Sequence, residues 1–164
     1  MAVNSKVEMV GASDIGLRLA GSGAVNTVVR TLPEARARVS QSLVGAVALP
    51  DRVFLNLENI TGVGDATIFQ VYVGLPDGAD PAANKDHLAG GVSLFGVRQA
   101  SDPAGKHAGS GLSVTMEITA VVDKLHLEGN FDVDALPVRI VPFGNIPESA
   151  RIRIGRISIY RQFD

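Results

Sequence analysis

Three histidines, His87, His107 and His126, are the side chains of this sequence best suited to hold a metal or move a proton. None lies four residues from another, the spacing that puts two ligands on one helix face, and no second carboxylate stands at ligand spacing around them. We therefore expect His87 and His107 in loops and His126 on a helix, as solvated or capping side chains. We predict no bound metal or other cofactor. The alternative is a mononuclear metal site assembled across loops.

Motifs for nucleophilic attack, phosphate binding and calcium binding are incomplete. Ser110 lies between two glycines but lacks the strand–turn–helix setting of a nucleophile elbow. The glycines of residues 62–64 lack the Lys-Ser/Thr pair that follows in a phosphate-binding loop. Asp132 and Asp134 alternate without the central Gly and later Glu of a calcium loop. The chain has no Cys, which excludes thiolate chemistry, so we predict no catalytic residue.

Positive charge gathers near the C-terminus, in Arg139, Arg151, Arg153, Arg156 and Arg161. Few aromatic residues alternate with these arginines, so the sequence does not predict a base-stacking platform for nucleic acid. The whole chain has 15 Lys and Arg against 17 Asp and Glu, a net charge of -2. This balance argues against a general nucleic-acid or membrane-surface binder. We expect the arginines to form an outward polar face or an ion-pairing rim against a protein partner.

Length and composition bound the architecture. The 164 residues are 46% hydrophobic and 20% charged, which is typical of one globular domain. No apolar run approaches the ~20 residues of a membrane span. Residues 1–10 lack the basic and apolar regions of a secretory signal, so a cytoplasmic location is the default expectation. The 18 Gly and 8 Pro residues are scattered, which favours many short strands over a helical bundle.

Alternating apolar and polar residues predict an all-β fold, an antiparallel and jelly-roll-like β-sandwich with one or two short helices. Eight or nine strands are expected, the clearest near residues 15–19, 24–30, 53–58, 67–75, 91–97, 112–118, 136–141 and 151–160. In the last of these strands, four isoleucines keep facing the core only if the chain bulges at Gly155-Arg156: Ile152, Ile154, Ile157 and Ile159.

One or two short helices are expected. The better one covers residues 119–127, with Thr119 as its cap and Gly129-Asn130 at its end. Residues 34–43, after Pro33, form a short helix or an exposed connector. A long loop is expected over residues 99–111.

The segment Ile68-Phe69-Gln70-Val71-Tyr72-Val73 resembles the Lys-Phe-Asp-Val-Tyr strand that names the C-terminal (KFDV-type) domain of plant polyphenol oxidases. Phe69, Val71 and Tyr72 match this strand, whereas Ile68 and Gln70 replace its Lys and Asp. Further segments resemble the family in the family's order: 52–60, 88–90, 118–125, 138–142 and 154–159. We predict from the chain length a single domain over 1–164. Residues 51–161 are its tyrosinase C-terminal-like β-sandwich core, and residues 7–50 are lead-in strands and a connector similar to those of bacterial tyrosinase-type proteins.

In that family the β-rich C-terminal domain is not catalytic. It packs over the dicopper centre of a tyrosinase or catechol oxidase and keeps the enzyme latent. The resemblance therefore implies a lid or regulatory domain rather than an enzyme, with a tyrosinase-type copper catalytic domain as its partner, in cis or in trans. The copper-binding histidine sets of that catalytic domain and the Cys-x-x-Cys motif of some fungal relatives are absent from this sequence.

Often one bulky side chain of such a domain fills the substrate pocket. The candidates for this plug are aromatic residues expected in loops, namely Phe143, Phe131 and Phe95. Phe143 comes first, because Pro142-Phe143-Gly144 is a turn that can project a side chain.

Two other functions stay open from the sequence. The first is a self-associating structural or scaffolding β-sandwich, since the hydrophobic content leaves room for an exposed apolar patch and for a homo-oligomer. The second is a sandwich that binds a small ligand or carbohydrate, for which a chain with no Trp and 2 Tyr offers little stacking surface.

Overall fold

The protein is described by a computed structural model for residues 6–13, 15–32, 52–64, 67–129, 132 and 134–163. The described residues form nine strands: β1 (Lys6–Ala12), β2 (Leu17–Leu19), β3 (Val25–Thr31), β4 (Arg52–Thr61), β5 (Ile68–Val73), β6 (Leu88–Ser93), β7 (Leu112–Glu117), β8 (Leu136–Pro142) and β9 (Ile152–Phe163). The helical segments are α2 (Val97–Ala100), α3 (Thr119–Leu127) and three 3-10 turns: η1 (Pro81–Ala83), η2 (Lys85–His87) and η3 (Glu148–Ala150). None of the described helices is long and apolar enough to cross a bilayer.

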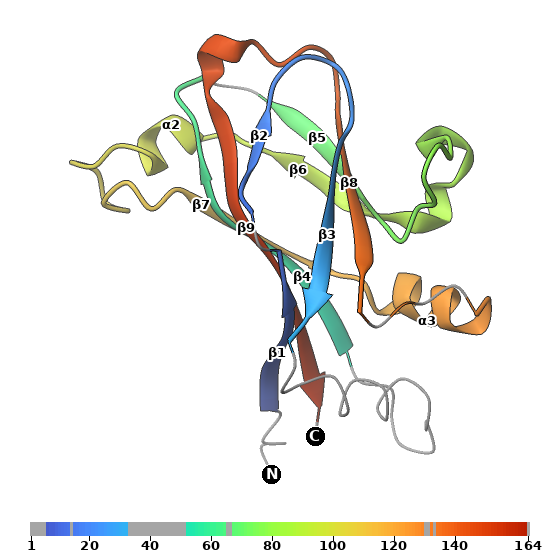
Figure 1. Ribbon diagram of the computed structural model, residues 1–164. Helices are drawn as coiled ribbons and strands as arrows, with labels where there is room; N and C mark the ends of the chain where they lie inside the picture. Colours follow the sequence, from blue (N-terminus) through green and yellow to red (C-terminus); the bar gives the residue numbers. More distant parts are fainter. Residues whose placement is uncertain are drawn as a thin grey trace.

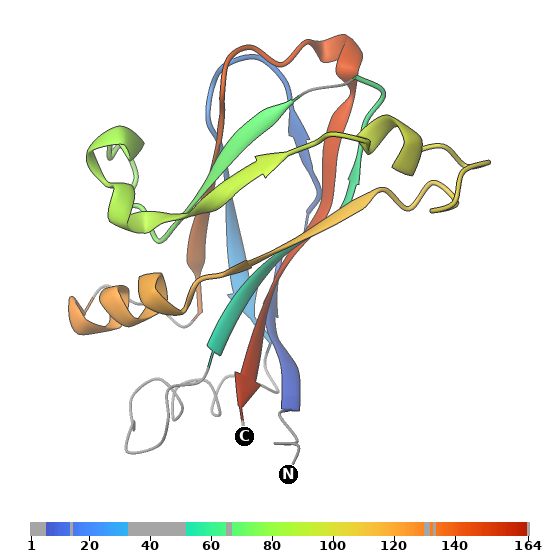
Figure 2. The ribbon, with the colours of Figure 1, turned by 180° about the vertical axis from the view of Figure 1, so that it is seen from behind.

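All strand pairs are antiparallel and follow one path, β6-β5-β8-β3-β1-β9-β4-β7, with β2 added beside β9. The path curls so far that its two ends, β6 and β7, approach each other, as the views from both sides show (Figures 1 and 2). The predicted antiparallel, mainly β fold is confirmed. The two layers expected of a sandwich are parts of one nearly closed, barrel-like sheet. β1, β2 and β3 are strands of that same sheet.

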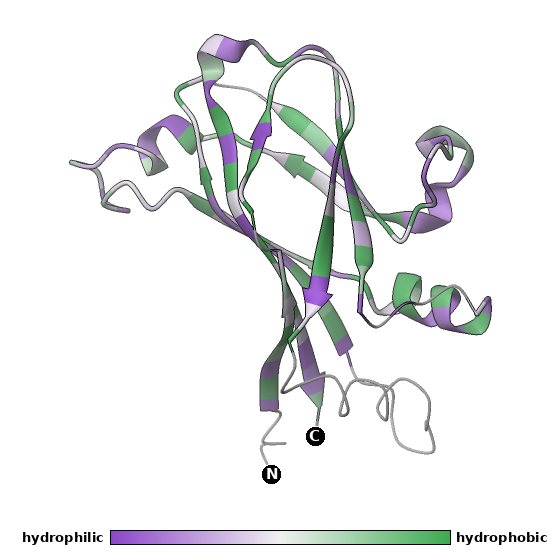
Figure 3. Cartoon of the chain, in the orientation of Figure 1, coloured by the Kyte–Doolittle hydropathy of each residue, from purple (hydrophilic) through white to green (hydrophobic). Residues whose placement is uncertain are grey.

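The core lies inside this curled sheet. Apolar and polar residues alternate along the strands, most clearly along β9 (Figure 3). Every second residue at the start of β4 is buried, at Val53, Leu55 and Leu57, because successive side chains of a strand point to opposite faces. The alternation read from the sequence therefore identifies the inward face of β4 correctly, since burial on one face selects it.

The expected break in β9 is present and is shared with β4. The four isoleucines of β9 are all buried, as predicted. The β4–β9 register nevertheless continues unchanged, from Glu58↔Arg156 to Ile60↔Ile154. Asn59, with φ 55°, lies opposite Gly155. At this place the alternation of buried and exposed side chains shifts by one residue in both strands. The extra residue appears instead between β4 and β7, whose register shifts between Leu57 and Ile60.

The helix at residues 119–127 is confirmed as α3, with Val121, Val122 and Leu125 on its buried face. The predicted cap is wrong, because Thr119 is the first helical residue. Its hydroxyl accepts a hydrogen bond from the Val53 N–H (3.0 Å) instead of capping the helix. The predicted helix or connector at 34–43 lies outside the described residues.

The sequence misplaced the segment after residue 87. The strand expected at 91–97 begins at Leu88 and ends at Ser93, and the helix α2 occupies the boundary between that strand and the expected loop. Gly96, with φ 83°, precedes the first residue of α2. No helical spacing of apolar residues in the sequence predicts this helix.

Candidate functional site

Three strands bring two exposed phenylalanines to one edge of the sheet. β5 begins where β6 and β8 end, since Ile68 pairs with Ser93 and Phe69 pairs with Pro142. On one side of Ile68, its carbonyl accepts the N–H of Phe143 (2.9 Å). On the other side, the Thr67 carbonyl accepts the N–H of Leu94 (2.9 Å), the residue before Phe95. Ile68, Phe95 and Phe143 therefore lie at the same end of three adjacent strands. We call the surface formed by these three residues the apolar edge.

Both phenylalanines of the apolar edge are almost fully accessible to solvent. Phe95 is 88% exposed and Phe143 is 76% exposed, while Ile68 between them is 48% exposed. A glycine in the left-handed conformation follows each ring, Gly96 with φ 83° and Gly144 with φ 95°. Tight turns therefore project both rings from the sheet ends. Phenylalanine is usually buried, so two exposed rings at one edge indicate a contact surface.

The other aromatic residues singled out from the sequence lie elsewhere. Phe69 and Val71 are completely buried in the core, and Tyr72 is buried with its hydroxyl donating to Gln70 Oε1 (3.1 Å). The family-motif strand is therefore a structural element, β5. Phe131 lies outside the described residues.

The histidines are not brought together, and among the described residues no three side chains of metal-ligating type form a group. His87 is buried rather than solvated, which corrects the expectation for it. Its Nδ1–H donates to the Val73 carbonyl (2.9 Å), which leaves Nε2 to accept from Lys124 Nζ (3.4 Å). Lys124 also pairs with Asp86 and lowers the pKa of that carboxyl below its ordinary value through a hydrogen bond. This cluster ties α3 to η2.

Three of the five C-terminal arginines are held within the chain. Arg139 is buried, not outward-facing, and donates to Asn26 Oδ1 (2.8 Å) and to the carbonyls of Ala79 (2.6 Å) and Pro76 (3.1 Å). Arg156 bonds to Glu58 (2.5 Å) and Arg161 to Glu8 (3.2 Å). The sequence could not reveal these contacts, because their partners lie 60 to 153 residues away in the chain.

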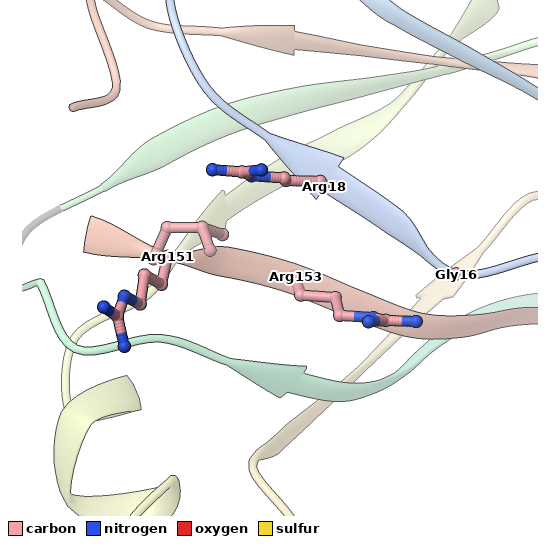
Figure 4. A pocket seen from close by; sticks show the side chains of 5 residues that line it. Gly16, Arg18, Arg151 and Arg153 are labelled. Atoms are coloured by element: carbon pink, nitrogen blue, oxygen red, sulfur yellow. The ribbon is translucent and has the colours of Figure 1, made fainter. Parts of the chain in front are cut away.

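The remaining two, Arg151 and Arg153, lie beside Arg18 and Gly16 around an open depression of about 460 Å³ (Figure 4). Arg18 comes from β2 and Arg153 from β9, where they are direct neighbours across the strands. Arg151 comes from the turn between η3 and β9. The depression therefore combines three cationic side chains from separate segments.

Comparison with known proteins shows which family this chain matches. A family model described as "Domain of unknown function (DUF7868)" matches residues 6–162. Tyrosinase HcTyr1 from Hahella sp. (strain CCB-MM4) is 26% identical over 113 residues, which are 69% of this chain and 24% of that protein.

Two solved structures share the fold. Latent aurone synthase (polyphenol oxidase) from natural source has a TM-score of 0.53 and 14% identity over 90% of this chain and 26% of its own. The recombinantly expressed form has a TM-score of 0.52 and 14% identity over 88% of this chain and 25% of its own. The chain thus spans about a quarter of the length of these relatives, and the resemblance to the C-terminal part of latent polyphenol oxidases is confirmed.

Proposed function

This chain belongs to the family described as a domain of unknown function, DUF7868, and from that membership and its fold we propose a function. We propose that it is a non-catalytic lid or regulatory domain of a tyrosinase-like dicopper oxidase, which covers the active site and keeps the enzyme latent. The tyrosinase relative and the fold of latent aurone synthase support this class of partner. The observation that carries the proposal is the apolar edge, where Phe95 and Phe143 are exposed on either side of the start of β5.

A phenylalanine suits the role of a plug for chemical reasons. Its ring has the shape of a phenolic substrate but lacks the hydroxyl group that such an oxidase oxidises. A ring held by a neighbouring domain also competes with free substrate at an effective concentration that reaches the order of millimolar. Phe143 is our first candidate because it is exposed on a turn directly after β8, and Phe95 is the second.

Burial of the ring sets the size of the effect. Covering a phenylalanine side chain is worth about 1.5–3 kcal/mol, or about ten- to a hundredfold in an equilibrium constant. Removing the plug should therefore shift the covered enzyme toward the open form by about tenfold or more. Removing an exposed apolar residue elsewhere should not.

The test joins the full chain to its tyrosinase-like copper domain, in cis or in trans, and measures diphenol oxidation. We expect the wild-type chain to suppress turnover and Phe143→Ala to restore it by about tenfold or more, with a smaller effect from Phe95→Ala. Leu127→Ala is the matched control, because Leu127 is 86% exposed on α3, away from the apolar edge.

Two results would overturn the proposal. The first is a wild-type chain that binds the copper domain without lowering turnover. The second is robust diphenol oxidation by the isolated chain when copper is added.

The same exposed rings favour one alternative function, a self-associating structural or scaffolding module in which a second copy covers the apolar edge. Light scattering of the pure chain separates the two. Self-association that Phe95→Ala and Phe143→Ala abolish, without any effect on an oxidase, supports the alternative, and a monomer at high concentration contradicts it.

A further inference from the structure

Two arginines occupy paired positions on neighbouring strands without a balancing acid. Arg18 and Arg153 are direct partners in the β2–β9 ladder. Like charges placed directly opposite in a sheet are destabilising. Among the described residues, no ion pair joins Arg18, Arg151 or Arg153 to a carboxylate, although Arg52, Arg156 and Arg161 each have one. The chain therefore places two like charges at paired strand positions here, whereas Arg52, Arg156 and Arg161 each lie beside a carboxylate.

The third arginine of this group, Arg151, has a rare backbone conformation. Arg151 has φ 50° and ψ 46°, the left-handed conformation that residues other than Gly and Asn rarely adopt. Its N–H donates to the Glu148 carbonyl (3.1 Å) and so closes η3. A glycine or asparagine would fit this turn more easily, so the arginine is not there for the turn. Strain at such a position points to a functional side chain.

The three guanidinium groups spread around the depression instead of meeting at one point. In Figure 4, the side chains of Arg18 and Arg153 extend in opposite directions, Arg153 toward Gly16, and Arg151 points downward. A side chain at Gly16 would crowd this arrangement, because its Cβ would lie 3.1 Å from a guanidinium nitrogen of Arg153. Three groups spread in this way do not converge on one point, as a site for a single small oxyanion would require. A segment that carries several separated carboxylates can reach them.

The position of these arginines relates them to the apolar edge. Residues 143–151 run from Phe143 through η3 to Arg151. Two hydrogen bonds between Gly21 and Ile146, of 2.7 and 2.9 Å, hold this connection against the turn that leads from β2 to β3. An exposed apolar anchor beside a charged rim is the usual anatomy of a protein interface.

We propose that Arg18, Arg151 and Arg153, the arginine surface, bind an acidic polypeptide segment of the partner that the apolar edge contacts. Its identity as the copper catalytic domain rests on the proposed function, whereas its acidic character rests on the arginines alone. Each guanidinium matches a carboxylate through two parallel hydrogen bonds. A protein segment fits better than a nucleic acid, because the whole chain carries a net charge of -2.

The first experiment needs no oxidase. The full chain is titrated with a fluorescent polyglutamate peptide at low salt, and in parallel with a single-stranded DNA oligonucleotide of similar charge. We expect the peptide to bind more tightly than the DNA, with binding weakened at least tenfold in the triple variant R18Q/R151Q/R153Q. Arg98→Gln is the matched control, an exposed arginine on α2. Equal binding by the triple variant, or DNA bound more tightly than peptide, overturns the proposal.

The second experiment measures association of the full chain with the copper domain over a range of salt concentrations. We expect the triple variant to associate about tenfold more slowly at low salt and to lose most of the salt dependence. Phe143→Ala should keep that dependence while it restores turnover. If the wild-type chain never suppresses turnover, the proposed function fails. If it does, and the triple variant behaves as Arg98→Gln, only the arginine surface fails.

Discussion

Phe95 and Phe143 illustrate how one residue type divides between core and surface in this chain. Phe69 is completely buried in β5, whereas these two rings stand at strand ends, each followed by a glycine with positive φ. The Phe-Gly pair is thus the local signal that separates an exposed ring from a core ring, because glycine permits the sharp turn that carries the ring outward.

At the residue scale, Arg153→Gln should stabilise the protein. The substitution removes the like charge opposite Arg18, which is worth about 0.2–1 kcal/mol in an exposed cross-strand pair. A small rise in the melting temperature at low salt is the expected result, and it should shrink as salt screens the repulsion. Arg98→Gln should leave the melting temperature unchanged, and a fall with Arg153→Gln would show that Arg153 has a stabilising partner.

At the scale of elements, the turning point shared by β4 and β9 depends on the absence of a side chain at Gly155. A Cβ built there would lie 2.9 Å from the Asn59 Cβ and 3.3 Å from the Glu58 carbonyl. Both neighbours are close to the backbone, so they cannot move aside without distorting two strands that meet along their whole length.

We therefore expect Gly155→Ala to lower the free energy of unfolding by about 1–3 kcal/mol, as overpacking usually does. Urea denaturation measures the loss. Gly91→Ala in β6 is the control, because its Cβ would have a single contact, at 4.0 Å from the Phe69 carbonyl. A loss with Gly155→Ala no larger than in this control would contradict the shared turning point.

Elements that follow a period could be predicted, and elements set by distant contacts could not. The spacing of Ile152, Ile154, Ile157 and Ile159 revealed the break in β9, because only an inward-facing set explains four isoleucines. The role of Asn59 was hidden, since nothing local indicates which residue pairs with Gly155. The helix α2 was missed because its four residues are too short to show a helical period.

The candidate site divides in the same way. Phe143 and Phe95 were identifiable as loop aromatics, but their placement on either side of Ile68 depends on the order β6-β5-β8. The pairing of Arg18 with Arg153 joins residues far apart in the chain, so no local pattern contains it. His87 was expected in solvent for a similar reason, because its burial depends on the Val73 carbonyl across a loop.

At the scale of the whole molecule, ion pairs between segments make stability depend on pH. Hydrogen bonds from arginine or lysine lower the pKa of Glu58, Asp86 and Glu117 below their ordinary values. A carboxyl with a lowered folded pKa adds stability above its unfolded pKa, and that stability is lost as the pH falls through the folded value. The ordinary values, 4.5 for Glu and 3.8 for Asp, therefore mark where the loss begins.

We expect the melting temperature to be level near neutral pH and to fall as the pH drops below about 4.5. Glu58→Gln should make this fall shallower. The free energy that the pair contributes should be less than ~1 kcal/mol, because Arg156 is partly exposed and solvent screens the pair. Thermal melts between pH 3 and 7 measure both slopes. Identical slopes for the variant and the wild type would show that the Glu58–Arg156 pair contributes nothing to the acid response.

The antiparallel pairing of β1 with β9 sets Lys6 opposite Phe163, so the start of β1 and the end of β9 lie side by side. Both strands leave the body at the lower end in Figure 1, whereas the connection from Phe143 to Arg151 lies at the upper end. β9 alone has 12 residues, about 40 Å at ~3.3 Å per residue. In the proposed complex, a linker from either strand to a copper domain docked over Phe143 would run back along that length. Such a linker would remain accessible to a protease while the docked surfaces are shielded.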